Sequence, residues 1–273
     1  MKFGMCNEFC EGWDFERVCS LAASAGYQGV EIAPFTLADS VKDINWQERQ
    51  GIRQTAEDNG LEVIGLHWLL VKPEGLHLNS PDRAVRKRTV DYLMAEIDFC
   101  SDIGGGVMIV GSPKQRNVLP GQSYPEVWQR SVEVFAELAE HGAERDVCLC
   151  IEPLGANETN FVHTAEQARR LVNAVGHPNF QMMLDVKAMC QDEEPIPDII
   201  RDSGPWLRHF HANDENLLGP GFGDTDFGPI AEALREVNYD GYVSVEVFDF
   251  SPGPEKIANK SIEHLRKVFG SPH

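Results

Sequence analysis

Apolar, β-branched runs alternate with amphipathic helical stretches along the whole chain, and this alternation limits the folds that the chain can adopt. Such alternation without strand hairpins is typical of a parallel sheet whose strands are covered by helices. The expected strands cover residues 2–9, 29–35, 61–70, 107–112, 148–154, 180–186, 207–214 and 242–248. Eight units in 273 residues give about 34 residues per unit, the spacing of a (β/α)8 barrel. We therefore predict one α/β TIM-barrel domain over residues 1–273.

An open, doubly wound sheet is the structural rival to the barrel. Such a sheet normally carries a Gly-x-Gly-x-x-Gly turn after its first strand, and "NEFCEGWDF" contains no such turn. Helical patterns cover residues 15–26, 85–104 and 124–142. The glycines expected to cap helix ends are Gly26, Gly60, Gly104 and Gly142. Long irregular segments follow expected strands at 71–82, 111–125 and 215–229, where a barrel carries its functional loops.

Composition and charge exclude several classes of protein. A formal net charge of −19 argues against a nucleic-acid partner, because a phosphate backbone is bound through clustered Lys and Arg. No stretch approaches the roughly 20 apolar residues of a membrane span, and the first residues lack a signal-peptide core. Seven cysteines without Cys-x-x-Cys spacing favour reduced thiols. We expect a cytoplasmic protein with no membrane partner, and a homo-oligomer remains an open option.

Four consecutive strands in the second half of the chain each end with a side chain of a metal-ligand type. Side chains alternate along a strand, so in "CLCIEPL" the two cysteines share one face with Glu152, and we assign that face to the barrel interior. Asp185, His211 and Glu246 stand at the corresponding ends of the next three strands, at intervals of 33, 26 and 35 residues. We expect all four side chains to meet at the C-terminal mouth of the barrel.

Three carboxylates at one mouth require a source of positive charge. Each close pair repels by about 4 kcal/mol at roughly 4 Å and an effective dielectric constant near 20. A divalent cation reverses the sign of this interaction. An oxygen-rich set with one imidazole suits Mn²⁺ best, with Mg²⁺, Co²⁺ or Zn²⁺ as alternatives. The sequence thus predicts one divalent metal held by Glu152, Asp185, His211 and Glu246, which explains why a buried apolar strand ends on a glutamate.

The segments "IEPLG", "MLDVKAM", "HFHANDEN" and "VSVEVF" resemble the xylose isomerase-like TIM-barrel superfamily. The resemblance is to its sugar phosphate isomerase/epimerase branch, which includes ketose 3-epimerases such as D-tagatose 3-epimerase. It extends over essentially the whole chain and is specific in the C-terminal half. It implies that Glu152 and Glu246 exchange the substrate proton as well as binding the metal. It also implies that Asp185 and His211 are pure metal ligands and that Glu158 contacts the substrate.

Two positions depart from the pattern of these epimerases. The family has a histidine three residues after the metal aspartate and an arginine six residues after the metal histidine, and both contact substrate oxygens. This chain has Ala188 and Leu217 at those positions. The metal chemistry can survive both changes, but the substrate is expected to differ.

The resemblance implies an isomerase or epimerase of a sugar or sugar phosphate that works through a metal-stabilised enediolate. One alternative is a metal-dependent dehydratase of an inosose or a dehydroshikimate-like polyol, because the same enediolate can expel a β-hydroxyl. A non-catalytic carbohydrate-binding barrel is a second alternative. A DNA-repair endonuclease of the endonuclease IV type shares the fold, but nine histidines and a net charge of −19 count against its zinc cluster and basic face.

Several further side chains are candidates for the substrate site. By strand parity, His67 and Glu31 point inward at the ends of their strands. Each could either contact the substrate or make a structural hydrogen bond. Arg116 could receive a phosphate or carboxylate, with solvated loop charge as its alternative. Lys187 could contact substrate or pair with a carboxylate, and Asp214 could bind substrate, orient His211 or end its strand. Trp68 enters a loop and could wall the pocket, but core packing against the helices is the preferred alternative; for His209 we expect a core or supporting role.

Overall fold

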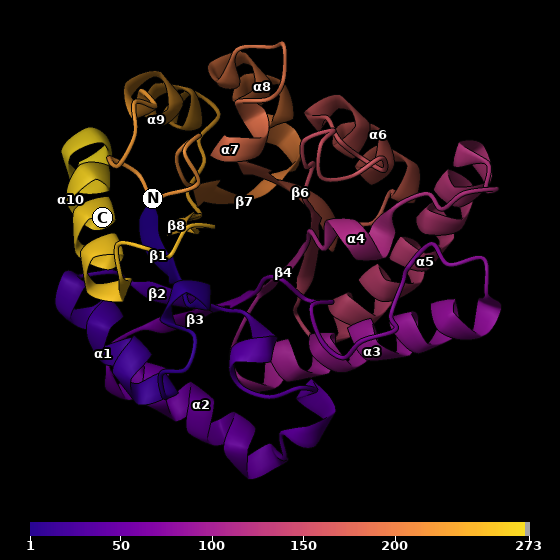
Figure 1. Cartoon of the computed structure of the whole chain (residues 1–273), viewed down its shortest axis with the longest axis horizontal. Coiled ribbons are helices and arrows are strands. Elements are labelled where there is room, and N and C mark those ends of the chain that lie inside the picture. Colours follow the sequence, from indigo (N-terminus) through magenta and orange to yellow (C-terminus); the bar gives the residue numbers. More distant parts are fainter. Residues whose placement is uncertain (271–273) are drawn as a thin grey trace.

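The computed structural model describes residues 1–270 as a closed barrel of eight parallel strands inside a ring of helices (Figure 1). The strands are β1 (Lys2–Cys6), β2 (Gly29–Ile32), β3 (Glu62–Leu66), β4 (Val107–Val110), β5 (Cys148–Ile151), β6 (Phe180–Asp185), β7 (Leu207–Ala212) and β8 (Tyr242–Val245). Each strand pairs in parallel with its neighbours in sequence, and β8 closes onto β1 with Val243 opposite Phe3. The predicted (β/α)8 barrel is confirmed.

Helices connect successive strands and cover the outside of the barrel. They are α1 (Phe15–Ala25), α2 (Trp46–Asp58), α3 (Arg83–Asp102), α4 (Pro113–Arg116), α5 (Tyr124–Glu144), α6 (Ala165–Val175), α7 (Val186–Met189), α8 (Ile196–Ser203), α9 (Phe227–Glu236) and α10 (Pro254–Phe269). Short 3-10 turns are η1 (Glu8–Cys10), η2 (Pro34–Thr36), η3 (Val41–Asp43) and η4 (Gly204–Trp206). The last helix, α10, lies beside α1 and so closes the ring (Figure 1).

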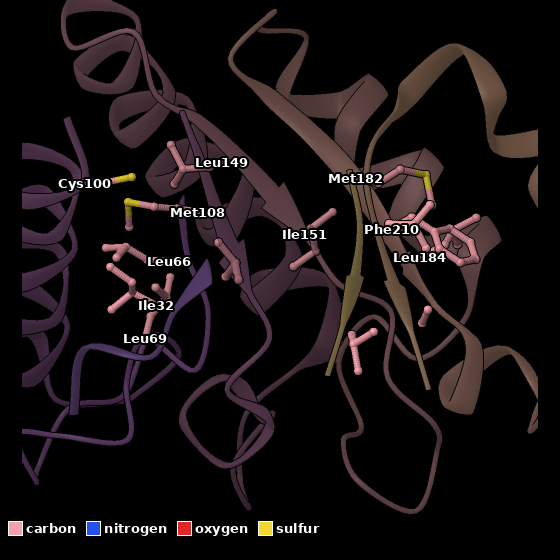
Figure 2. Packing of buried hydrophobic residues seen from close by; sticks show 14 of the residues in the cluster. Ile32, Leu66, Leu69, Cys100, Met108, Leu149, Ile151, Met182, Leu184 and Phe210 are labelled. Carbon is pink, nitrogen blue, oxygen red and sulfur yellow. The ribbon is translucent and has the colours of Figure 1, made fainter. Parts of the chain in front are cut away.

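The two faces of the strands form two separate apolar layers. One face packs against the helices, and Figure 2 shows Met108, Leu149 and Phe210 among the side chains of this large outer layer. The other face forms a smaller cluster inside the barrel, made of Ile64, Val107, Ile109, Cys148, Cys150 and Met183. The strand alternation therefore places the two cysteines of β5 inside the barrel, and Glu152, which follows them with the same parity, continues that face.

Three of the four expected glycine caps follow helix ends. Gly26, Gly60 and Gly104 have φ angles of +94°, +70° and +90°, a left-handed conformation that costs glycine little. The prediction for Gly142 is wrong, because α5 continues through it to Glu144. Gly142 instead allows the turn at Val147 to approach the helix closely. A Cβ atom at position 142 would lie 2.6 Å from the carbonyl oxygen of Val147, and the N–H of Val147 donates to the carbonyl oxygen of Gly142.

The strands end earlier at their C-terminal ends than the apolar runs in the sequence suggest. β3 ends at Leu66 and β7 at Ala212, whereas the runs continue to residues 70 and 214. The residues just beyond the ladder turn into loops at the barrel mouth, and these loops carry most of the polar side chains described below. Among the described residues, no helix combines the length and apolar character needed to cross a membrane.

Gly65→Ala is expected to destabilise the protein strongly. A Cβ atom at Gly65 of β3 would lie 1.9 Å from the carbonyl oxygen of Val107 in β4, so the two strands would have to separate. We expect a loss of about 3 kcal/mol or more in the free energy of unfolding. The control is Gly51→Ala in α2, where a Cβ atom meets nothing within 4 Å and alanine favours the helix by about 1 kcal/mol. Equal urea midpoints for the two variants would contradict this prediction.

Candidate metal centre and active site

Strand register brings the four ligand-type side chains together at the C-terminal mouth of the barrel. Asp185, the last residue of β6, lies opposite His211 of β7, and His211 lies opposite Ser244, two residues before Glu246. Glu152 follows the last residue of β5 directly. One ligand atom from each of Glu152, Asp185, His211 and Glu246 lies within 4.8 Å of those of the other three, and all four residues are buried. This spacing allows a single ion to contact all four.

Glycine makes room for Glu152 in this cluster. A Cβ atom on Gly111, just after β4, would lie 2.2 Å from Oε2 of Glu152. Any larger residue at position 111 would therefore force the carboxylate away from its neighbours. The cluster thus depends on a small residue just after β4, a strand that contributes no ligand of its own.

Asp185 is fixed by hydrogen bonds on both carboxylate oxygens. Its Oδ1 accepts from the backbone N–H of Ala188 at 2.8 Å and so caps the short helix α7. Its Oδ2 accepts from Nδ2 of Asn213 at 2.5 Å, and Oδ1 of Asn213 accepts from the backbone N–H of Lys187 at 2.7 Å. Asn213 therefore ties the end of β7 to the start of α7 and holds the Asp185 carboxylate in one orientation.

His211 is held between two carboxylates. Its Nδ1 lies 3.1 Å from Oε2 of Glu246, and its Nε2 lies 3.0 Å from Oε1 of Glu31. The second oxygen of Glu31 lies 2.7 Å from Nε2 of His209. A proton on His211 Nε2, donated to Glu31, leaves the Nδ1 lone pair for a metal. Glu31 and His209 are both buried. For Glu31, this arrangement is the structural hydrogen bond that the sequence left open as an alternative to a substrate contact.

Burial and mutual repulsion set the charges of the four side chains. Burial, together with the Glu246 and Asp185 carboxylates, raises the pKa of Glu152 to about 8. Burial also raises the pKa of Asp185 to about 6, although Lys187 opposes the change. For Glu246, burial acts in the same direction, but the charge and hydrogen bond of His211 hold its pKa below the ordinary range. A divalent cation competes with these protons for the same oxygens, so the donor set fits a metal.

Binding of Mn²⁺ is expected to strengthen as the pH rises from 6 to 8. Glu152 and Asp185, with pKa values of about 8 and 6, must lose their protons to bind a cation. Both pKa values are raised on folding, so the protein without metal loses the contribution of Asp185 to stability as the pH rises to about 6 and that of Glu152 as it rises to about 8. The difference in melting temperature between protein with Mn²⁺ and protein with EDTA should therefore widen from pH 6 to pH 8. A difference that stays constant or narrows would contradict these assignments.

A cavity of about 420 Å³ opens directly onto the cluster. It is lined by Trp68, Val71, Ser112, Pro113, Lys114, Gln115, Glu152, Leu154, Glu158, Glu246 and Phe248. The prediction of core packing for Trp68 is wrong: its ring stacks between Phe35 and Phe248, and its Nε1 donates to Oε1 of Glu246 at 2.8 Å. The chain leaves β3 with a φ of +52° at Trp68, and this local conformation turns the indole toward the site. Strand parity could not predict it.

The other candidate residues take different places. Glu158 lines the cavity and pairs with Lys187, whose Nζ lies 2.9 Å from Glu158 Oε1. His67 is fully buried, and its Nε2 lies 3.0 Å from Oε2 of Glu8. Asp214 is buried and accepts from Thr225 and the backbone N–H of Gly223, so it organises the loop after β7.

The prediction that Arg116 receives a substrate anion is not supported by its position. The side chain is buried, and its guanidinium donates to the carbonyl oxygens of Val110 and Val162. Arginine often bridges backbone segments in this way, and here it joins the loops after β4 and β5. Lys114, two residues earlier on α4, is the basic residue that lines the cavity.

Sequence reasoning missed two residues of the site region, Asn213 and Glu8, and preferred the wrong one of two places for Trp68. Asn213 has the same parity as His211 two residues earlier, so the alternation could have found it. Glu8 lies in η1 after β1, where its Oε1 accepts from the backbone N–H of Val247, next to Glu246. A residue in a 3-10 turn has no strand parity, and nothing in the sequence marks it.

The chain is similar to known proteins both in sequence and in fold. D-psicose 3-epimerase of Agrobacterium fabrum is 30% identical over 259 residues, covering 91% of this chain and 85% of that protein. Fructoselysine 3-epimerase of Shigella flexneri is 25% identical and covers 98% of both chains. The crystal structure of a D-psicose 3-epimerase in the presence of D-fructose matches the fold with a TM-score of 0.86 at 24% identity, covering 99% of this chain and 100% of that one.

The barrel, its polar mouth and these relatives define the class of the protein: a TIM-barrel enzyme of the sugar isomerase and epimerase type, as the sequence predicted. The chain belongs to the xylose isomerase-like TIM barrel family, whose model matches residues 19–268.

Proposed function

We propose that this protein is a divalent-metal-dependent ketose 3-epimerase. The observation that carries the proposal is the convergence of four ligand atoms, from Glu152, Asp185, His211 and Glu246, within 4.8 Å of one another beside a cavity of about 420 Å³. The cavity is large enough for a monosaccharide. The relatives named as D-psicose, fructoselysine and ketose 3-epimerases support the same reaction type.

The four donors would hold one divalent ion, for which Mn²⁺ is our first choice and Mg²⁺, Co²⁺ and Zn²⁺ are alternatives. When bound, such an ion supplies Lewis-acid stabilisation of negative charge that develops on substrate oxygens. Hydrogen bonds from Ala188 and Asn213 orient Asp185, and Glu31 orients His211. These contacts fix the donor atoms before substrate binds.

Glu152 and Glu246 would carry the proton between the two faces of the substrate carbon. One carboxylate removes the proton next to the carbonyl to give an enediolate, and the other glutamate delivers a proton to the opposite face. Their environments push the two pKa values in opposite directions, to about 8 for Glu152 and below the ordinary range for Glu246. Trp68 fixes one oxygen of Glu246 by a hydrogen bond.

The test is proton exchange at substrate carbons in D₂O with Mn²⁺-loaded protein across a panel of free and phosphorylated ketoses. An epimerase incorporates one deuterium at C3 and gives a C3 epimer of otherwise unchanged mass. A dehydratase instead gives a product lighter by one water. The absence of exchange with every ketose, at full metal occupancy, would refute the proposed function.

A further inference from the structure

Lys187 places a buried positive charge beside the candidate active site. The residue is only 4% exposed, and its Nζ lies 2.9 Å and 3.1 Å from the two carboxylate oxygens of Glu158. The same Nζ lies 3.9 Å from the centroid of the Phe248 ring. Glu158 and Phe248 both line the cavity, so the Lys187 ammonium contacts two lining side chains although Lys187 is not itself a lining residue. Asn213 fixes the Lys187 backbone at the start of α7.

Among the residues that line the cavity, Ser112, Lys114 and Gln115 can donate a hydrogen bond to a sugar oxygen, and all three come from the segment after β4; the Trp68 Nε1 donor is engaged by Glu246. The charged lining residues are the carboxylates of Glu152, Glu158 and Glu246, which only accept when ionised, and Lys114 on the exposed face of α4. Arg116 is engaged by backbone carbonyl oxygens, and Ala188 next to Lys187 has no polar side chain. A bound ketose presents a carbonyl and several hydroxyl oxygens that need donors.

We propose that Lys187 donates a hydrogen bond to one oxygen of the bound ketose and is thereby a specificity-determining residue of the site. This inference rests on the proposed function. An ammonium group has three N–H donors; the two Glu158 oxygens and the Phe248 ring surround this one, so a substrate oxygen would take over a donor that these partners now hold. The ion pair and the Phe248 ring hold the flexible side chain in place, so little side-chain entropy is lost when substrate binds. Glu158 and Lys187 together would then offer an acceptor and a donor to neighbouring substrate oxygens.

Lys187→Met removes the donors and keeps a long, flexible side chain. We expect kcat/KM for C3 proton exchange to fall about 10-fold to 100-fold, the loss typical of a hydrogen bond to a charged group. The affinity for Mn²⁺, measured by titration calorimetry, should change by less than about threefold. The matched control is Lys2→Met, because Lys2 also pairs with a glutamate, Glu62, but does so in the open at the N-terminal end of β1. That variant should match the wild type.

Competition by substrate analogues separates substrate contact from a purely structural role. Each analogue lacks one oxygen of the best ketose, including the carbonyl oxygen, and is tested as an inhibitor of exchange by wild-type and Lys187→Met protein. For each analogue, the inhibition constant of Lys187→Met is divided by that of the wild type. If Lys187 donates to one oxygen, this ratio falls to about one only for the analogue that lacks that oxygen. A ratio that is the same for every analogue would overturn the inference. If Lys187→Met does not fold, Lys187→Leu, which also lacks a donor, gives the same comparison.

The two proposals fail in different ways. A wild-type protein that exchanges no proton on any ketose would overturn the proposed function and this inference with it. If the wild type exchanges the C3 proton but the inhibition ratio of Lys187→Met is the same for every analogue, only the role of Lys187 is overturned.

Discussion

Glu246→Gln is expected to leave the protein folded and to reduce C3 proton exchange by about 10³-fold. In the wild type, Trp68 Nε1 lies 2.8 Å from Glu246 Oε1. The amide keeps the shape of the side chain, and its oxygen can still accept this hydrogen bond. An amide cannot remove a proton from carbon, and loss of a general base typically costs 10²-fold to 10⁴-fold. The measurement is deuterium incorporation at C3 in the presence of saturating Mn²⁺.

The control for this variant is Glu236→Gln on α9. Glu236 pairs with Arg201 on the outside of the barrel, so its neutralisation removes the same charge far from the mouth. Its exchange rate should equal that of the wild type. Undiminished exchange in Glu246→Gln at full metal occupancy would refute the assignment of Glu246 as a base.

Asp185→Asn is expected to weaken Mn²⁺ binding by about 100-fold or more and to abolish exchange at micromolar metal. The variant loses a charged ligand but keeps an oxygen that can cap α7 through the N–H of Ala188. Because we assign Asp185 to metal binding alone, part of the exchange activity should return at millimolar Mn²⁺. Titration calorimetry gives the affinity, and exchange rates at rising Mn²⁺ give the recovery.

The contrast between these two variants separates the roles within the cluster. Glu246→Gln should stay inactive at any metal concentration, whereas Asp185→Asn should recover. Recovery of both, or of neither, would mean that metal binding and proton transfer are not divided between Asp185 and Glu246 as proposed.

The fold could be predicted because each strand of a parallel barrel is buried on both faces and therefore appears as an apolar run. The same alternation predicts which side chains face inward, which is why Glu152, Asp185, His211 and Glu246 could be found together. Their actual meeting depends on register, such as Asp185 opposite His211, and on Gly111, which leaves space for Glu152. Register is a property of the assembled barrel that periodicity along one strand does not contain.

The two misplaced residues of the site region lie where the alternation along the strands stops. Trp68 enters the site through a left-handed backbone conformation, and Arg116 turns inward from a four-residue helix to bind backbone carbonyl oxygens. Gly142 appeared to be a helix cap, but a close contact with the following turn explains it better. In each case the decisive interaction is with a segment distant along the chain or with a loop, which local sequence patterns do not encode.

The central claim is that Glu152, Asp185, His211 and Glu246 bind one divalent ion. Anomalous diffraction at the manganese edge from crystals grown with Mn²⁺ tests it directly. We predict a single strong peak at the C-terminal mouth of the barrel, within about 2.0–2.3 Å of one atom from each of the four side chains. A peak elsewhere, or no peak at saturating Mn²⁺, would contradict the claim.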